Sequence, residues 1–222
     1  MQPCTRNQIA DFIEKWHYSH NINGVVSDYC FSMLDGSTLI GAMIYGKIAM
    51  ADVWKKYADN ESDLIELRRL CCIDDTPKNT ESYFIGKTLK WLKQNTDIKR
   101  VISYADTTYG HEGTIYKATN FRHCGMTNTG RVIIYDGSLE DSDQLTMFDN
   151  PKRNKTHRYH DKTIRTGYKN RLKPFAKKVK KALETGNAWY ENTSGKHIYL
   201  YDFKRKTAIL PKKQQFSLFF DN

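Results

Sequence analysis

Residues 100–121 read RVISYADTTYGHEGTIYKATNF, and this stretch decides the fold that we expect. Residues 100–105 are largely apolar and predict a short buried strand. A polar stretch follows from Asp106 to Glu112, and a short helix is predicted from Gly113 to Thr119. Because α/β proteins gather ligands beyond the carboxyl ends of their strands, the polar stretch is a candidate functional site.

The chain before this stretch supplies a partner strand. Residues 64–72 predict a strand, and the helix that follows has apolar positions up to about Gln94. The order strand, helix, strand, helix predicts a βαβ unit with parallel strands. Residues 29–34 and 38–46 are rich in strand formers on either side of a turn, and they predict an antiparallel hairpin.

Further elements are predicted nearer the two ends of the chain. Thr5 and Gln8 form a capping-box pattern ahead of a helix predicted over residues 6–17. Residues 140–173 show no convincing periodicity. The other predicted elements are a helix over 174–184 and strands over 131–135, 188–191, 197–202 and 208–210.

Length and composition bound the class of protein. With 222 residues, 39% of them hydrophobic, the chain can bury one ordinary core. We therefore predict one α/β (α+β) domain, a mixed sheet flanked by helices over residues 1–140, with a basic extension over residues 141–222 packed on it. No apolar run is long enough to cross a membrane and no secretory signal is evident, so we expect a cytoplasmic protein with no membrane partner. The five cysteines fit neither a disulfide framework nor a zinc ribbon.

The basic residues are concentrated in one segment. Residues 150–181 contain 13 Lys and Arg against one acidic residue, whereas residues 1–149 contain 16 against 20. Aromatic residues are interleaved with these basic residues, and this combination suits contacts with phosphates and bases. The alternative is a solvated loop, but the low internal neutralisation favours DNA binding. The predicted DNA contacts are Arg153, Lys155, Arg158 and Arg165.

Three side chains in and just after the polar stretch could carry acid–base chemistry. Asp106 could orient a base or bind a metal, His111 could move a proton, and Tyr116 could donate a proton to a leaving group. Simpler roles stay open, since Asp106 could cap a turn and His111 could be an ordinary loop histidine.

A second candidate site lies at the end of the first predicted helix. His17 and Tyr18 offer an imidazole and a phenol, and these donors together suit a transition metal such as iron. The alternative for this pair is aromatic packing beside Trp16.

Taken together, these segments resemble the Mom family of phage DNA-modification proteins. The resemblance covers roughly residues 10–135 and rests on three motifs. The motifs are His17-Tyr18-Ser19, then Glu66-Leu67-Arg68-Arg69-Leu70 with Asn79 and Ser82, and finally Ser103-Tyr104-Ala105-Asp106 with the block from Gly110 to Phe121. The resemblance implies conversion of adenine in DNA to a carbamoylmethyl adenine, which protects the DNA from restriction in the bacterial host of a phage or prophage.

The Mom family is similar to GNAT-type acyltransferases, so the resemblance also implies a GNAT-like sheet. It implies that Tyr116 is a proton donor and that the cofactors are iron and acetyl-CoA or another acyl donor. The residues implied for the acyl-donor or catalytic site are Arg68, Asn79 and Ser82. Those implied for iron binding are His17, Tyr18 and Asp106. One departure from GNAT enzymes is that residues 78–83, in place of their pyrophosphate loop, contain no glycine.

DNA is the expected partner, with the target adenine flipped out of the helix or single-stranded. Two other functions stay open. One is a conventional GNAT acetyltransferase that acts on a protein or a small amine, and the other is a DNA-binding module without catalysis. The sequence leaves the oligomeric state open.

Overall fold

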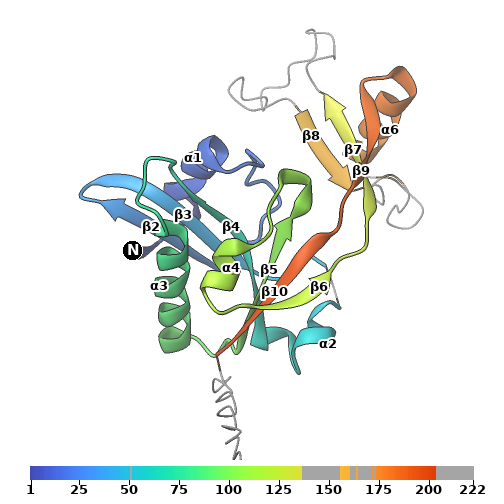
Figure 1. The fold of residues 1–222 in the computed structure, drawn as a ribbon. Helices are drawn as coiled ribbons and strands as arrows, with labels where there is room; N and C mark the ends of the chain where they lie inside the picture. Colours follow the sequence, from blue (N-terminus) through green and yellow to red (C-terminus); the bar gives the residue numbers. More distant parts are fainter. Residues whose placement is uncertain (51, 137–155, 161–163, 165–171, 173, 204–222) are drawn as a thin grey trace, which may run out of the picture.

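The computed structural model describes residues 1–50, 52–136, 156–160, 164, 172 and 174–203 (Figure 1). A seven-stranded sheet forms its centre, in the strand order β1-β2-β3-β4-β5-β10-β6. Strands β4 and β5 pair in parallel, and the other neighbours pair antiparallel. The strands are β1 (Gln2–Cys4), β2 (Tyr29–Asp35), β3 (Thr38–Gly46), β4 (Leu64–Cys72), β5 (Arg100–Asp106), β10 (Lys196–Asp202) and β6 (Arg122–Met126).

Helices cover both faces of this sheet (Figure 1). On one face, α1 (Arg6–Trp16) buries Ile9 and Ile13 against residues of β3 that include Ile44. On the other face, α3 (Thr80–Asn95) and α4 (Thr114–Ala118) pack on the alternate residues of the strands. The remaining short helices of this part are α2 (Trp54–Tyr57), η1 (Glu61–Asp63) and η2 (Thr107–Tyr109).

Strands β4 and β5 diverge along their length. Their paired residues run only from Leu64 with Arg100 to Glu66 with Ile102, although the two strands continue to Cys72 and Asp106. The backbone ladder between the described residues of this pair therefore covers only its first part. The carboxyl ends of the two strands separate, and side chains and ligands can enter between them.

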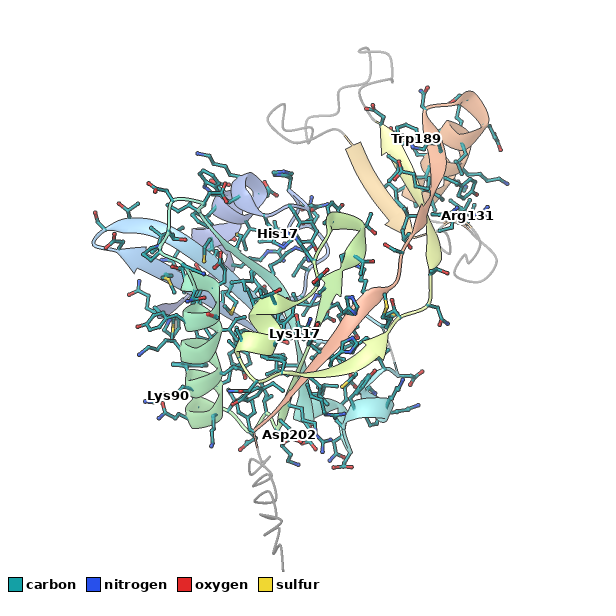
Figure 2. All side chains as sticks on the ribbon, viewed as in Figure 1. His17, Lys90, Lys117, Arg131, Trp189 and Asp202 are labelled. Atoms are coloured by element: carbon teal, nitrogen blue, oxygen red, sulfur yellow. The ribbon has the colours of Figure 1, made fainter. Side chains whose placement is uncertain are left out.

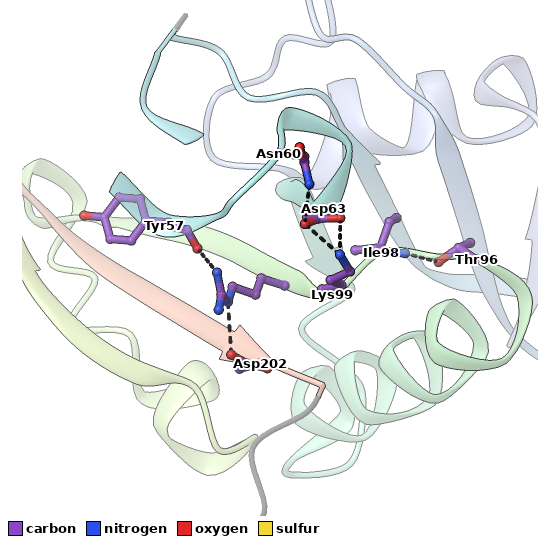
Figure 3. Close-up of polar contacts among 8 residues, drawn as sticks. Tyr57, Asn60, Asp63, Thr96, Ile98, Lys99 and Asp202 are labelled. Atoms are coloured by element: carbon purple, nitrogen blue, oxygen red, sulfur yellow. Dashed lines mark hydrogen bonds and ion pairs between the residues drawn. The ribbon is translucent and has the colours of Figure 1, made fainter. Parts of the chain in front are cut away.

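A polar network holds the opposite end of the sheet together (Figure 3). Arg100 donates from Nε to Asp202 Oδ2 at 3.0 Å and from Nη1 to the Tyr57 carbonyl oxygen at 2.7 Å. Lys99 pairs with Asp63 at 2.9 Å. These contacts join α2, η1 and β10 to Lys99 and Arg100 at the start of β5. They fix the end at which β4 and β5 are paired, whereas the carboxyl ends of the two strands stay apart.

A second sheet, in the order β8-β7-β9, lies beyond β6 and β10 (Figure 1). Its strands are β7 (Gly130–Asp136), β8 (Thr156–His160) and β9 (Ala188–Thr193), and its helix is α6 (Pro174–Thr185). One sheet face packs against Val179 and Ala182 of α6 through Ile133, Tyr135 and Ala188. Since β6 leads into β7 and β9 leads into β10, two neighbouring strands of the main sheet carry this unit. The predicted boundary after residue 140 falls between β7 and β8, which pair with each other.

The predicted α/β class, with a mixed sheet flanked by helices, is confirmed. The βαβ unit is β4–α3–β5, and the predicted hairpin is β2–β3. Strand β8 lies where no periodicity was expected, because it pairs with β7 although its own sequence, THRYH, is polar. The predicted strand over residues 208–210 lies outside the described residues. In the part of the chain that the structure describes, no helix is long and apolar enough to span a membrane.

Candidate functional site

A cavity of about 460 Å³ opens where β4 and β5 diverge. The end of α1 with the two residues after it, residues 110–116 and Glu81 at the start of α3 complete its wall. Figure 2 shows His17 between α1 and the segment that follows β5. The lining residues that matter below are His17, Tyr18, Arg68, Arg69, His111 and Tyr116.

Tyr116 lies in the wall of this cavity with its ring buried. Its ring packs on Tyr199 and Phe121, with centroid distances of 5.2 and 5.5 Å. Burial raises the pKa of the Tyr116 phenol, and a hydrogen bond with Ser103 offsets only part of that rise. The phenol is therefore protonated at neutral pH, as a proton donor must be.

The position of Tyr116 depends on a glycine and on Tyr199. Gly113 has φ +72°, and a Cβ atom there would lie 2.2 Å from the Tyr199 ring. The Tyr199 hydroxyl donates to the Glu112 carbonyl oxygen at 2.6 Å. Only glycine permits this approach, so Tyr199 and Gly113 together set where α4 begins.

Asp106 ends β5 with its side chain buried. Its Oδ2 pairs with Lys196 Nζ at 2.9 Å, and its Oδ1 accepts from the backbone N–H of Thr108 at 3.1 Å. Burial alone would raise the pKa of Asp106, but the Lys196 ammonium and the Thr108 hydrogen bonds hold it below its usual value. Asp106 is therefore a carboxylate that caps η2 and also places negative charge beside the cavity.

An aromatic group lies at the cavity next to Asp106. The Tyr18 ring contacts His17 at 4.2 Å, Tyr109 at 4.4 Å and the edge of His111 at 4.9 Å between centroids. Burial, together with Arg69 and other histidines, lowers the pKa of His17 to about 3. Burial and the Asp106 charge raise the pKa of Tyr18 to about 12. Both side chains are therefore neutral near pH 7.

Arg68 and Arg69 bring two guanidinium groups to the β4 side of the cavity. Arg68 Nη1 contacts Glu66 Oε2 at 3.3 Å and the Lys47 carbonyl oxygen at 3.1 Å. Arg68 Nε is buried and has no hydrogen-bond partner among the described residues. An unsatisfied buried donor is costly, and an anionic or carbonyl group of a bound molecule would satisfy it.

Asn79 and Ser82 lie at the start of α3, beside Glu81, which lines the cavity. Asn79 is the N-cap residue with φ +73°, and the Ser82 hydroxyl donates to its carbonyl oxygen at 2.9 Å. The assignment of these two residues to an acyl donor stays a prediction.

The donors predicted to bind iron gather near one another, but the described conformation does not present a formed site. Asp106 is paired with Lys196, and His17 Nδ1 lies 2.8 Å from Ser19 Oγ and accepts from the Ser19 backbone N–H at 3.1 Å. No group of three His, Cys, Asp or Glu side chains suited to a metal occurs in the described ranges. Iron binding by His17, Tyr18 and Asp106 therefore stays a prediction, and it would require Asp106 to give up its pairing with Lys196.

The structure thus brings together six predicted residues that are distant in the sequence: His17, Tyr18, Arg68, Asp106, His111 and Tyr116. Sequence reasoning missed Lys196 and Ser103 as partners of site residues. No local signal marks Lys196, because only the β5–β10 pairing places it opposite Asp106. Of the predicted DNA contacts, Arg153, Lys155 and Arg165 lie outside the described residues, as does the side chain of Arg158 on β8.

Comparisons with known proteins give three kinds of match. A model of the Mom protein family matches residues 1–216. The methylcarbamoylase Mom of Escherichia phage Mu is 30% identical over 118 residues, which are 51% of this chain and 48% of that protein. The chain therefore matches about half the length of this curated relative.

Solved structures with a similar arrangement are acetyltransferases. The aminoglycoside acetyltransferase AAC(6')-Ib, solved with ribostamycin and coenzyme A, aligns with a TM-score of 0.43 at 10% identity, over 57% of this chain and 84% of that chain. An N-acetyltransferase from Staphylococcus aureus Mu50 aligns with a TM-score of 0.39 at 11% identity, over 90% of this chain and 79% of that chain.

Proposed function

The chain belongs to the Mom protein family, and we propose from this membership that it is a transferase that converts adenine in phage DNA to carbamoylmethyl adenine. The modified group is the exocyclic amine, and the modification protects the DNA from host restriction. The observation that supports this proposal is the cavity between the diverging ends of β4 and β5, which is lined by Tyr116, Arg68 and Tyr18. The Asp106 carboxylate lies close enough to Tyr18 to raise its pKa.

The proposed product constrains the chemistry. Attack of the adenine amine on an acyl carbonyl carbon would give an amide, whereas a carbamoylmethyl group joins the nitrogen to a methylene carbon. The reaction therefore differs from ordinary acetyl transfer at the bond that forms.

Each cavity residue has a role that its environment supports. Tyr116 keeps its proton because its hydroxyl is buried, so it can give that proton to a leaving group. Arg68 offers an unsatisfied Nε–H that can anchor an oxygen of the donor. His17 is neutral, and Asp106 supplies a fixed negative charge close to Tyr18.

The size of the cavity supports a base-sized substrate. Its volume of about 460 Å³ lies within the range of about 300–1,000 Å³ that is typical of small-molecule sites. An adenine within a duplex cannot enter such a cavity, so the base would be flipped out or taken from a single strand. The DNA backbone would be bound by the basic segment of residues 150–181.

Nucleoside mass spectrometry on plasmid DNA from expressing cells tests this function. The expected result is a modified adenine that is missing when Tyr116→Phe replaces the wild-type protein. Acetylated protein or small amine with unmodified DNA would favour a conventional acetyltransferase. Protection from a nuclease that survives in both Tyr116→Phe and Asp106→Ala would favour a DNA-binding module without catalysis.

Iron binding by His17, Tyr18 and Asp106 is a further part of this proposal. It requires Asp106 to exchange Lys196 for the metal, because the pair occupies Oδ2 in the described conformation. Iron in the purified protein that falls in Asp106→Ala would support this part. Iron content that is the same in wild type and Asp106→Ala would contradict it.

A further inference from the structure

Aromatic ring contacts lead from buried His17 through the cavity wall to the exposed ring of Tyr109. His17 is 4% exposed, Tyr18 is 39% exposed and Tyr109 is 43% exposed. The centroid distances are 4.2 Å from His17 to Tyr18 and 4.4 Å from Tyr18 to Tyr109. His111 adds an edge contact to Tyr18 at 4.9 Å. The rings of Tyr18 and Tyr109 thus pack on each other, and both reach solvent.

Tyr109 is held in a defined place. It ends η2, whose first residue, Thr107, donates from Oγ1 to the Gly195 carbonyl oxygen at 2.6 Å. Asp106 caps the same turn, and Gly110 closes it with φ +71° and an N–H donated to the Thr107 carbonyl oxygen. A turn fixed at both ends presents the Tyr109 ring without a large loss of conformational entropy on binding.

We propose that Tyr109, supported by Tyr18, is the surface on which the extruded adenine stacks as it enters the cavity. This inference rests on the proposed function. Tyr18 and His111 line the cavity and both contact the Tyr109 ring, so a base on Tyr109 would lie beside two residues of the cavity wall. Any base has a π face that can stack on a tyrosine, and a base that leaves the duplex loses its stacking partners.

The simpler alternative is that Tyr109 only packs the turn onto Tyr18 and His111. The two roles predict different binding affinities for DNA in which the adenine leaves the helix at little cost. A stacking residue changes how tightly the protein holds an extruded base, whereas a packing residue changes stability and affects every DNA equally.

Equilibrium binding of the full-length protein to two duplex probes tests the proposal. In one probe the central adenine pairs with thymine, and in the other it faces an abasic site, where it leaves the stack easily. Wild type is expected to bind the abasic-opposed adenine roughly tenfold more tightly, and Tyr109→Leu is expected to lose most of that preference. Tyr109→Phe keeps the ring and is expected to restore it. Tyr83→Leu, at a tyrosine on α3 that is 59% exposed, is the control and is expected to match wild type.

Modified adenine in plasmid DNA from cells that express each variant separates this proposal from the proposed function. If wild type modifies adenine and Tyr109→Leu keeps the full binding preference, the stacking role is wrong and the function stands. If wild type modifies no adenine but its preference depends on the Tyr109 ring, the stacking role stands and the function is wrong. If wild type shows no modification and no binding preference, both the stacking role and the proposed function are wrong.

Discussion

Asp106 is the residue on which the electrostatics of the cavity depend. Its carboxylate is buried, and Lys196 supplies the compensating positive charge from β10. A buried carboxylate without a cation would shift toward its neutral form, because burial penalises the charged form. Lys196 therefore determines the charge that Tyr18 and any substrate meet.

We expect Lys196→Met to weaken this arrangement in a pH-dependent way. The pKa of Asp106 is lowered in the folded protein. The ion pair therefore stabilises the fold at pH values above the unfolded-state pKa of about 3.9. This stabilisation is lost as the pH falls through the lower pKa of the folded state. In Lys196→Met the free energy of unfolding at pH 7 should drop by about 1–3 kcal/mol, with a smaller difference from wild type near pH 2. Urea denaturation of wild type and variant at both pH values measures this difference in the free energy of unfolding. An equal loss at the two pH values would show that the ion pair is not the cause.

The Tyr116→Phe substitution removes one hydroxyl and keeps the ring, so it tests the proposed proton donor without changing the packing. The ring contacts with Tyr199 and Phe121 remain, and only the hydrogen bond with Ser103 is lost. We expect no detectable modified adenine and a loss of about 0.5–1.5 kcal/mol in the free energy of unfolding. Tyr45→Phe is the matched control, because it removes a buried hydroxyl that bonds Thr88 in the core. Near-normal modification by Tyr116→Phe would exclude Tyr116 as the proton donor.

At the scale of elements, the contact between Gly113 and Tyr199 sets the position of α4, rather than the helix propensity of its own residues. The helix is short, so its stability comes from packing. Gly113 allows the Tyr199 ring to lie against the backbone at the point where the helix begins.

Two glycine substitutions test this placement. Gly113 and Gly110 have almost the same φ, +72° and +71°, but only at Gly113 would a Cβ meet other atoms within 4 Å. Gly110→Ala should therefore cost about 1–2 kcal/mol of backbone strain. Gly113→Ala should have the same backbone strain and lose a further 1–3 kcal/mol, roughly, from the clash with Tyr199. It should also abolish modification of adenine. Denaturation curves of both variants measure the difference, and equal costs would mean that Tyr199 moves aside freely.

At the scale of the whole molecule, the basic excess and the cavity belong to different parts of the chain. Residues 1–149 hold the cavity and are mildly acidic, and residues 150–181 hold the basic excess. The strands β6 and β10 connect the cavity to the second sheet, which carries the described basic helix α6 (Figure 1). Under the proposed function, the basic part would hold the DNA backbone while the cavity acts on a base.

The salt dependence of DNA binding tests that division. Each phosphate contact removed should reduce the slope of log K against log salt by about 0.9 for duplex DNA. Replacement of Arg153, Lys155, Arg158 and Arg165 by Ala should therefore flatten the slope by about 3–4 and weaken binding. Replacement of Lys87, Lys90 and Lys93 on α3 is the control and should leave the slope unchanged. A quadruple variant with wild-type affinity and slope would place the DNA-binding surface elsewhere.

The sequence by itself determined the local elements and the candidate chemistry. Periodicity and capping predicted α1, the β2–β3 hairpin and the β4–α3–β5 unit, because those patterns depend on residues close together in the chain. Tertiary structure alone decided that β10 inserts between β5 and β6, which brings Lys196 to Asp106 across 90 residues. It also decided the divergence of β4 from β5 and the contact of Tyr18 with Tyr109. These features depend on strand order and on packing between distant segments, and no pattern within one segment records its distant partner.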